Sequence, residues 1–195
     1  MSFGADVAIR LNNFHKLNTG VSRYEKFSYL INEILPILRP EIVCDKVKLR
    51  ESLLTKFSLI VVDKLLKCEL TSGLNELRTA IPNARWLIVS GGDQAELRQV
   101  FEQRGIADYF DGGIYGSPRS KFTILSDLLE TGVIKDSVLS LGDSRLDHEV
   151  AIEFDFDFVF VSKWTEFIGW RKYCEKHQIQ SIKSISDLLN SSVIK

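Results

Sequence analysis

One stretch constrains the fold of this chain more than any other: Val138–Val150, an apolar run followed by Gly-Asp and by a second aspartate four residues later. The residues Val138–Leu141 predict a short buried strand, Gly142 predicts a turn, and Leu146–Ile152 predict the start of a helix. A strand, a tight turn and a helix in direct succession are typical of α/β proteins with parallel sheets. We therefore expect this stretch to lie within such a sheet.

The two aspartates of this stretch suggest a metal site. Asp143 follows the predicted strand directly, and in parallel sheets the carboxyl ends of the strands are where ligands bind. Two carboxylates on either side of a tight turn can converge on one hard cation. We predict Mg²⁺, with Asp143 as a direct ligand and Asp147 supporting it by direct contact or through water. The alternative is that Asp143 only caps the helix and Asp147 lies on its solvated first turn.

Composition limits the classes of protein to consider. The chain has 195 residues, of which 45% are hydrophobic and 26% charged, so we expect one domain, or one core with an insertion. The formal net charge is -1 with acids and bases interspersed, which does not favour nucleic-acid binding. No apolar run approaches the ~20 residues of a membrane span, and no signal peptide is recognisable. We expect a cytoplasmic protein without a membrane partner.

The cysteines, Cys44, Cys68 and Cys174, are odd in number and widely spaced. This arrangement favours a reducing compartment over a disulfide framework or a zinc site. We predict that all three fill the hydrophobic core. The three histidines show no partner pattern and are assigned no chemistry.

The chain divides into a helical part and an alternating part. In the first third, helices are predicted over Ala5–Leu17, over Glu41–Leu54 and over Lys56–Leu66. Another helix is predicted to begin after Ser22 and to be ended by Pro36 and Pro40. Within Lys56–Leu66, the segment Leu59–Asp63 is rich enough in β-branched residues to suggest a strand, but its flanks favour helix.

After Leu70, predicted strands and helices alternate. The strands are Trp86–Val89, Gly113–Tyr115, Val138–Leu141 and Phe156–Val161; the helices are Ser72–Ala80, Gln94–Arg104, Arg119–Thr131, the one ending at Glu153, one around Phe167–Tyr173 and a short last one at Ser186–Leu189. Such alternation predicts βαβ units and a mostly parallel sheet covered on both faces.

Polar residues follow three of these strands or open the helices after them. Ser90 and Gly91 follow the strand that ends at Val89, Lys121 opens a helix, and Asp143 follows Gly142. A hydroxyl, backbone N–H groups, a lysine and a cation held by carboxylates can together bind a phosphate group.

This ordered set resembles the haloacid dehalogenase (HAD) superfamily of phosphohydrolases. In that family a strand ends in Ser or Thr, matched by Ser90; a lysine follows, matched by Lys121; and then comes Gly-Asp-x-x-x-Asp, matched by Asp143 and Asp147. The resemblance covers Leu70–Val161, and its segment from Tyr115 to Lys121 is close to the phosphoglycolate-phosphatase-like branch.

The resemblance implies a Rossmann-like three-layer core over residues 69–195 and an α-helical cap over residues 1–68. It implies that Ser90 and the Gly91 amide hold phosphoryl oxygens, that Lys121 neutralises the phosphate and the nucleophile, and that Mg²⁺ is the cofactor. Arg23 and Lys26 of the cap are candidate contacts to an anionic substrate; the alternative is a solvated helix face.

The chain departs from the family at its first motif. The family requires Asp-x-Asp after a first strand upstream of the cap, with one aspartate as nucleophile and the other as general acid/base. The only Asp-x-Asp here is Asp155–Asp157, which follows the fourth motif, and Asp63 is followed by Lys-Leu. Met1 falls where the family would already be entering its cap. In the family the missing strand lies mid-sheet, so we expect either a gap or direct pairing of its neighbours.

Two main hypotheses follow. The first is a Mg²⁺-dependent phosphohydrolase of a small phosphorylated metabolite that is truncated and inactive as given. The second is a non-catalytic module that binds phosphate or metal. A third interpretation, an unrelated nucleotide-binding α/β domain, has only the Gly91–Gly92 pair in its favour, because no Gly-x-Gly-x-x-Gly follows.

Overall fold

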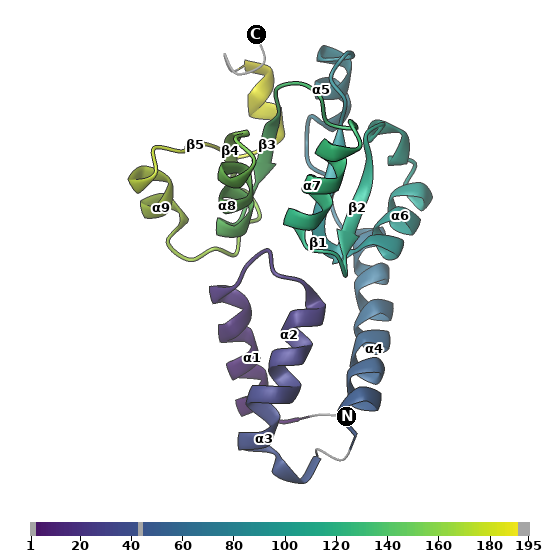
Figure 1. The fold of residues 1–195 in the computed structure, drawn as a ribbon, viewed down its shortest axis with the longest axis vertical. Coiled ribbons are helices and arrows are strands. Elements are labelled where there is room, and N and C mark those ends of the chain that lie inside the picture. The colour runs from purple at the N-terminus through teal and green to yellow at the C-terminus, as the bar shows by residue number, and fades with distance from the viewer. Residues whose placement is uncertain (1–2, 43–44, 191–195) are drawn as a thin grey trace.

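The computed structural model describes residues 3–42 and 45–190 and shows a mixed α/β fold with small, all-parallel sheets (Figure 1). The N-terminal part consists of α1 (Ala5–Leu17), α2 (Arg23–Tyr29), a π-helical turn (Leu30–Ile34), α3 (Leu35–Leu38), a 3₁₀ turn (Pro40–Ile42) and α4 (Lys46–Lys67). These helices have a core of their own, formed by Val7, Leu30, Ile31, Ile34 and Leu35. The predicted helical character of the first third is therefore confirmed for its described residues.

The helix that begins after Ser22 passes Pro36 and ends at Leu38, before Pro40, the second of the two prolines expected to end it. The hydroxyl of Ser22 accepts a hydrogen bond from the Glu25 N–H and caps α2, as its sequence indicates. Pro36 does not end the helix, however, because it lies inside α3. The π-helical turn just before it lets the Leu35 N–H reach the carbonyl of Leu30, and this wider turn accommodates a proline that lacks an N–H of its own.

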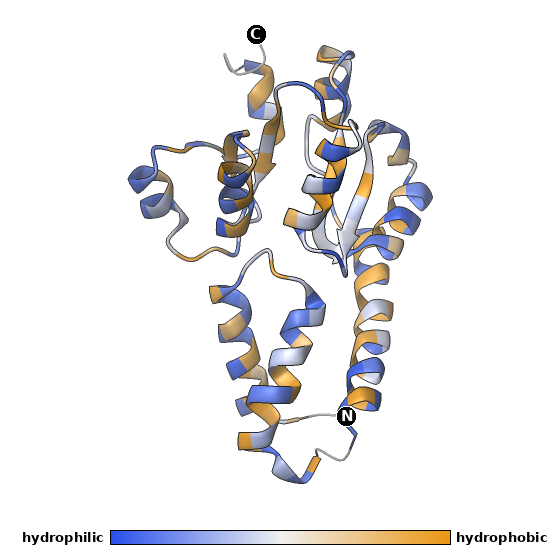
Figure 2. Ribbon diagram, in the orientation of Figure 1, coloured by the Kyte–Doolittle hydropathy of each residue, from blue (hydrophilic) through white to orange (hydrophobic). Residues whose placement is uncertain are grey.

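The two helices predicted over Glu41–Leu54 and Lys56–Leu66 are one helix, α4. The hydroxyl of Thr55, at the predicted break, donates to the carbonyl of Glu51 at 2.9 Å, so this residue is accommodated without interrupting the helix. The helical prediction for Leu59–Asp63 is confirmed. Hydrophobic residues recur along α4 (Figure 2), yet none of its side chains is fully buried.

The rest of the chain alternates between strands and helices, as predicted. Its elements are α5 (Leu74–Ala80), β1 (Leu87–Asp93), α6 (Gln94–Gln103), a 3₁₀ turn (Ala107–Tyr109), β2 (Gly113–Ser117), α7 (Lys121–Glu130), β3 (Leu139–Gly142), α8 (Arg145–Glu153), β4 (Asp157–Val161), α9 (Trp170–Lys176), β5 (Gln180–Ile182) and a 3₁₀ helix (Ile185–Asn190). The predicted last helix is thus a 3₁₀ helix, and the short strand β5 was not predicted.

The strands form two sheets, so of the two outcomes expected, a gap or direct pairing, direct pairing of β1 with β3 does not occur. One sheet has the order β1-β2 and the other β3-β4-β5, and every strand pair is parallel. In the register, Leu87 lies beside Gly113 and Leu139 beside Asp157. Within the described residues, β1 and β3 each have one strand neighbour, and no strand ladder joins them.

The predicted burial of β1 and β3 is wrong. All side chains of β1 are partly exposed, and Leu141 of β3 is 38% exposed. Buried residues occur instead in β4, where Val159 is 3% and Phe160 0% exposed, and in β2, where α6 and α7 cover Ile114 (7%) and Ser117 (2%). β4 has a strand on each side, whereas β1 and β3 each have one open edge. A strand's burial depends on its neighbours, which its own sequence does not specify.

One helix packs against residues of both sheets. Ile124, Leu125 and Leu128 of α7 form a core cluster with Val150 of α8 and with Ile134. Side chains packed against this cluster come from β1 (Leu87 and Val89), from β2 (Tyr115) and from the residue before β3 (Val138). The two sheets therefore share one hydrophobic core.

The cysteines only partly follow the prediction. Cys174 is buried, as expected, but Cys68 is exposed, so its assignment to the core is wrong. Cys68 ends α4, where Arg104 donates to the carbonyls of Leu65 and Cys68 and thereby caps the helix at the surface. Cys44 lies outside the described residues.

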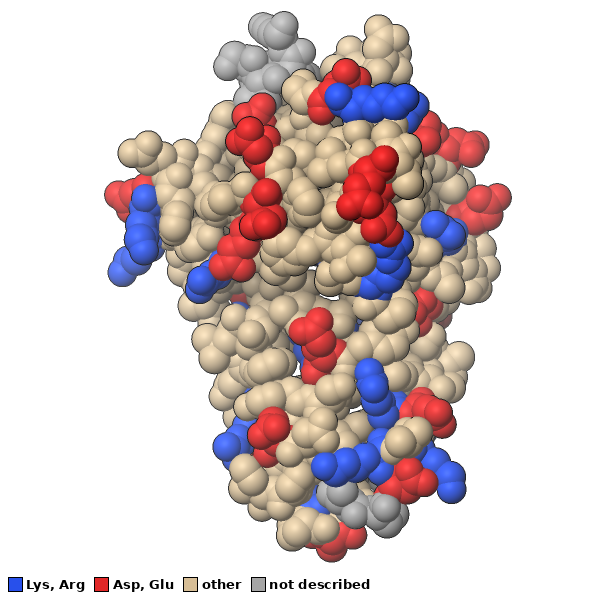
Figure 3. Space-filling view, in the orientation of Figure 1, with Lys and Arg blue, Asp and Glu red and all other residues tan. Residues whose placement is uncertain are grey.

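On the face shown in Figure 3, acidic and basic side chains are interspersed. None of the helices in the described ranges is both long enough and apolar enough to cross a membrane.

Candidate functional site

The carboxyl ends of the parallel strands lie on the side of the core that faces the N-terminal helices (Figure 1). On this side the chain leaves β2 for the start of α7 and leaves β3 for the start of α8. Lys121 is the first residue of α7, and Asp147 lies in the first turn of α8. The topology therefore brings the predicted lysine and the second predicted aspartate to the same edge.

Lys121 and Asp147 form a buried ion pair between Nζ and Oδ1. Their side chains are only 13% and 12% exposed, so both charges are largely withdrawn from water. A charge in such a place must be paired, because burying it alone is unfavourable by several kcal/mol. The alternative that Asp147 lies on a solvated helix turn is therefore wrong.

The other oxygen of Asp147 is occupied by the turn itself. Its Oδ2 accepts hydrogen bonds from the Asp143 N–H at 3.2 Å, the Ser144 N–H at 3.1 Å and the Ser144 hydroxyl at 2.6 Å. Ser144 in turn accepts from the Asp147 N–H, which completes a capping box. The helix cap is thus Ser144, and the alternative that Asp143 serves as the cap is wrong.

Gly142 is required by this arrangement. A Cβ atom at this position would lie 2.3 Å from the Cβ of Asp147, closer than two such atoms can approach. The glycine that precedes Asp143 in the sequence therefore makes room for the carboxylate four residues after it.

Asp143 has a carboxylate with no partner from another residue in the described part of the chain. Although much of its surface remains open, the surrounding protein removes part of its hydration, and this raises its pKa above the ordinary value. The nearby Asp147 carboxylate raises the pKa further, while Lys121 opposes the shift. An unpaired, partly dehydrated carboxylate beside a lysine can accept a cation or a hydrogen-bond donor.

Ser90 lies in the irregular last part of β1, where the register with β2 shifts between Val89 and Asp93. Its hydroxyl oxygen accepts a hydrogen bond from the Gly92 N–H at 3.0 Å, which leaves the hydroxyl hydrogen available. Ser117 fixes this end of the strand by donating to the Gly91 carbonyl at 2.9 Å. Ser90 makes no hydrogen bond with Lys121 or Asp143. Of the predicted phosphate- and metal-binding residues, direct contacts therefore join only some.

The loop between α1 and α2 crosses these strand ends. A Cβ atom on Gly91 would lie 2.6 Å from the Gly20 carbonyl oxygen, and a Cβ atom on Gly20 would lie 2.6 Å from the Ser144 hydroxyl. One residue of the loop thus contacts both the end of β1 and the turn after β3. The sequence gives no sign of this contact.

Arg23, a candidate for substrate contact, is buried against α6. Its Nη1 donates to Oε1 of Glu96 at 2.6 Å, and its guanidinium lies 4.9 Å from the ring centre of Phe57. The neighbouring Tyr24 hydroxyl donates to Asp93 at 2.6 Å, a bond that, together with burial, raises the pKa of Tyr24 to about 12. These contacts attach α2 to the end of β1 and the start of α6.

Lys26, the other candidate, is partly buried, and this burial lowers its pKa. The carboxylates of Glu166 and Glu25 oppose the shift. Glu166 also contributes, less than burial and Asp147, to raising the pKa of Asp143. Neither Arg23 nor Lys26 forms a hydrogen bond or ion pair with Lys121 or Asp147.

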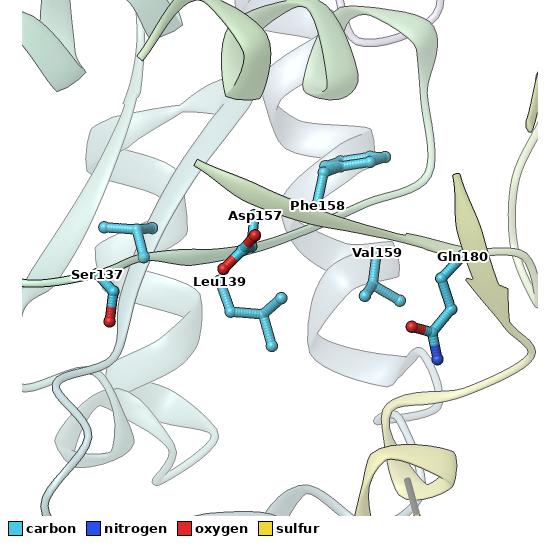
Figure 4. A pocket seen from close by; sticks show the side chains of 7 residues that line it. Ser137, Leu139, Asp157, Phe158, Val159 and Gln180 are labelled. Atoms are coloured by element: carbon cyan, nitrogen blue, oxygen red, sulfur yellow. The ribbon is translucent and has the colours of Figure 1, made fainter. Parts of the chain in front are cut away.

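Two cavities of about 420 Å³ each lie outside the Lys121–Asp147 pair and Asp143. One lies at the junction of α2, α4 and α6 and is lined by Arg23, Tyr24, Leu54, Thr55, Ser58, Leu59, Asp93, Ala95 and Glu96. The other lies near the beginnings of β3 and β4 (Figure 4), where Asp157 and Val159 point to one side of β4 and Phe158 to the other. Neither is lined by Asp143 or Lys121.

The carboxylates at the strand ends are too few for a dedicated metal cage. Within residues 3–42 and 45–190, no group of three or more His, Cys, Asp or Glu side chains is arranged to hold a metal ion. Mg²⁺ commonly uses one or two carboxylates and completes its shell with water and phosphate oxygens. Asp143 could therefore bind the ion directly. Both oxygens of Asp147 already have partners, so Asp147 could contact the ion only through a water molecule.

No protein-family model matches this chain, and no curated protein matches it.

Proposed function

We propose that the carboxyl edge formed by Ser90, Gly91, Lys121, Asp143 and Asp147 binds the phosphate group of a small phosphorylated metabolite together with Mg²⁺. The observation that carries this proposal is the partnerless Asp143 carboxylate beside the buried Lys121–Asp147 pair. A cation at Asp143 and the ammonium of Lys121 together attract a dianion to an edge whose carboxylates would otherwise repel it.

The side chains have separate roles in this proposal. Asp147 fixes the ammonium of Lys121 and the turn of Asp143, so that both charges stay at the strand ends. The Ser90 hydroxyl donates to a phosphate oxygen, since its own oxygen already accepts from Gly92. Mg²⁺ held by Asp143 would withdraw charge from the phosphate oxygens.

The finer fold assignment is part of the same proposal. We assign residues 69–195 to a Rossmann-like three-layer core of HAD type that lacks its first strand, and residues 1–68 to a helical cap. The separation of β1 from β3 and the helical core around Ile34 support it. The cytoplasmic location suggested by the cysteine pattern belongs to the proposal as well.

Hydrolysis by the 195-residue chain is not part of the proposal. The carboxylate of Asp63 is paired with Lys67 on α4, and the Asp155–Asp157 motif lies at the start of β4, at the end of the strand opposite to the site. Neither can act as a nucleophile at a phosphate held by Lys121. The alternative function is therefore a non-catalytic phosphate or metal module, which the same observations favour for this chain taken by itself.

The test is titration calorimetry with Mg²⁺ on the full chain and on two matched variants. Asp143→Asn removes the partnerless carboxylate, whereas Asp136→Asn makes the same change at an exposed aspartate before β3. We expect weak binding that falls by roughly 10- to 100-fold in Asp143→Asn and is unchanged in Asp136→Asn. Equal affinity for all three proteins would remove Asp143 from the site.

A further inference from the structure

A cavity of about 420 Å³ lies where α2, α4 and the start of α6 meet. α4 packs against both of the other helices, and the ion pair between Arg23 and Glu96 joins α2 to α6. The volume of this space, called here the junction cavity, falls within the range of small-molecule sites. None of the residues assigned to the phosphate-binding edge lines it.

One wall of the junction cavity carries a carboxylate oxygen without a partner. Oε1 of Glu96 accepts a hydrogen bond from Nη1 of Arg23 at 2.6 Å, but Oε2 is buried and accepts none. No other buried side-chain nitrogen or oxygen atom in the described residues lacks a partner. A buried carboxylate oxygen is costly to leave unpaired, so it calls for a hydrogen-bond donor. Because Glu96 lines the cavity, that donor can come from a molecule inside it.

Most other polar groups of the wall are already engaged. Asp93 accepts from the hydroxyl of Tyr24 with one oxygen and from the first N–H groups of α6 with the other. The hydroxyl of Thr55 donates to a carbonyl within α4. The half-buried hydroxyl of Ser58 makes no hydrogen bond to another described residue. A molecule in the cavity would therefore meet two available groups, Oε2 of Glu96 and the Ser58 hydroxyl.

The charges of the wall specify the charge of the ligand. Arg23 contributes one positive charge, and Asp93 and Glu96 contribute two negative ones, so the wall favours a monocation and repels a phosphate. A metal ion would need several oxygen ligands, whereas an ammonium group is satisfied by a few hydrogen-bond acceptors. Leu54 and Leu59 provide an apolar surface for a hydrocarbon body. These features together fit an organic ammonium ion.

We propose that the junction cavity binds a small primary amine whose ammonium group donates to Oε2 of Glu96 and to the Ser58 hydroxyl, with its hydrocarbon body against Leu54 and Leu59. The proposal uses no residue of the phosphate-binding edge and does not depend on that site. Because the wall comes from α2, α4 and α6, the bound amine links the N-terminal helices to the core. It therefore stabilises the folded chain.

The probe is cyclohexylmethylamine, titrated into the full chain by calorimetry at pH 7, where an aliphatic amine is charged because its pKa is about 10. Cyclohexylmethanol has the same body without the charge. We expect saturable binding of the amine, at least roughly tenfold tighter than that of the alcohol, with new hydrogen-exchange protection over residues 54–59 and 93–96. No saturable binding of the amine, equal binding of the alcohol, or protection confined to the phosphate-binding edge would overturn the proposal.

Two variants with matched controls locate the binding site. Glu96→Gln keeps the size of the side chain but puts an NH₂ donor or a neutral oxygen in place of the charged oxygen, and Glu102→Gln makes the same change at an exposed residue of α6. Because Glu96→Gln also weakens the bond to Arg23, Ser58→Leu fills the cavity and leaves the ion pair intact. Ser126→Leu, at a half-buried serine of α7, is its control. We expect Glu96→Gln to weaken binding at least roughly tenfold and Ser58→Leu to abolish it. The proposal is wrong if either binds the amine as its control does.

Discussion

Lys121 and Asp147, 26 residues apart in the chain, form an ion pair that joins the first turns of α7 and α8. The pair links the element that follows β2 to the element that follows β3, and these strands belong to different sheets. Because the same aspartate also holds the turn of Asp143, the position of the candidate ligand depends on this contact.

We expect Lys121→Met to lower the free energy of unfolding by about 3 kcal/mol, because it leaves the largely buried Asp147 carboxylate without its counter-ion. The double variant Lys121→Met/Asp147→Asn should lose less than the sum of the two single changes. Arg145→Met breaks an exposed pair with Glu149 and should leave stability nearly unchanged. Urea unfolding measures all four proteins; additive losses would show that the pair contributes nothing.

Gly91→Ala should displace the loop between α1 and α2, because its new Cβ would meet the Gly20 carbonyl at 2.6 Å. We expect a loss of about 1–3 kcal/mol and faster hydrogen exchange over residues 18–22. Gly92→Ala is the control, since its Cβ would meet only side-chain atoms at ordinary or slightly short range, Leu97 Cδ1 at 3.3 Å and Ser90 Oγ at 3.4 Å. Equal effects of the two changes would mean that the loop does not rest on β1.

The raised pKa of Asp143 gives stability a defined dependence on pH. The folded protein binds the proton of the Asp143 carboxyl more tightly than the unfolded chain does. At a pH above the folded pKa, the charged carboxylate therefore destabilises the fold. Below the ordinary pKa of 3.8 the carboxyl is protonated in both states and has no such effect. We expect Asp143→Asn to increase stability at pH 7 by up to about 1 kcal/mol. The gain should disappear as the pH falls below 3.8. Thermal melts at several pH values test this; a gain that grows with acidity would contradict it.

The purified chain should not turn over a generic aryl phosphate in the presence of Mg²⁺. A lysine and a cation can polarise the ester, but the two carboxylates at this edge are engaged otherwise, Asp147 by Lys121 and Ser144 and Asp143, in the proposal, by the cation. Removing the nucleophile from a set of groups that act together removes most of the rate. Turnover that disappears in Asp63→Asn would overturn this prediction.

The alternation of elements could be predicted from sequence because apolar runs and breaking residues are local signals. The strand before Gly142 and the cap at Ser22 are examples, and both are present. β5 was not recognised, since Gln180–Ile182 is short and mostly polar. Helix continuity at Pro36 depends on a π-helical turn that has no simple sequence pattern.

The sequence predicted where the candidate site lies, because topology determines that, but not which side chains pair within it. Parallel strands place Lys121, Asp143 and Asp147 at one edge whatever else the chain does. The choice of partners is a tertiary effect: nothing in the spacing indicates that Lys121 pairs with Asp147 or that Arg23 is buried against Glu96. The exposure of β1 and β3 likewise depends on which strands lie beside them.

The central claim, that Asp143 and Lys121 form a shared site for Mg²⁺ and phosphate, is tested most directly by the coupling between the two ligands. Inorganic phosphate is titrated into three proteins, the unchanged chain, Asp143→Asn and Asp136→Asn, each with and without Mg²⁺. Phosphate binding is followed by the broadening of the ³¹P line. We predict that Mg²⁺ tightens phosphate binding at least about fivefold in the unchanged chain and in Asp136→Asn, and that this coupling disappears in Asp143→Asn. Phosphate binding that is the same with and without Mg²⁺ in all three proteins would contradict the account.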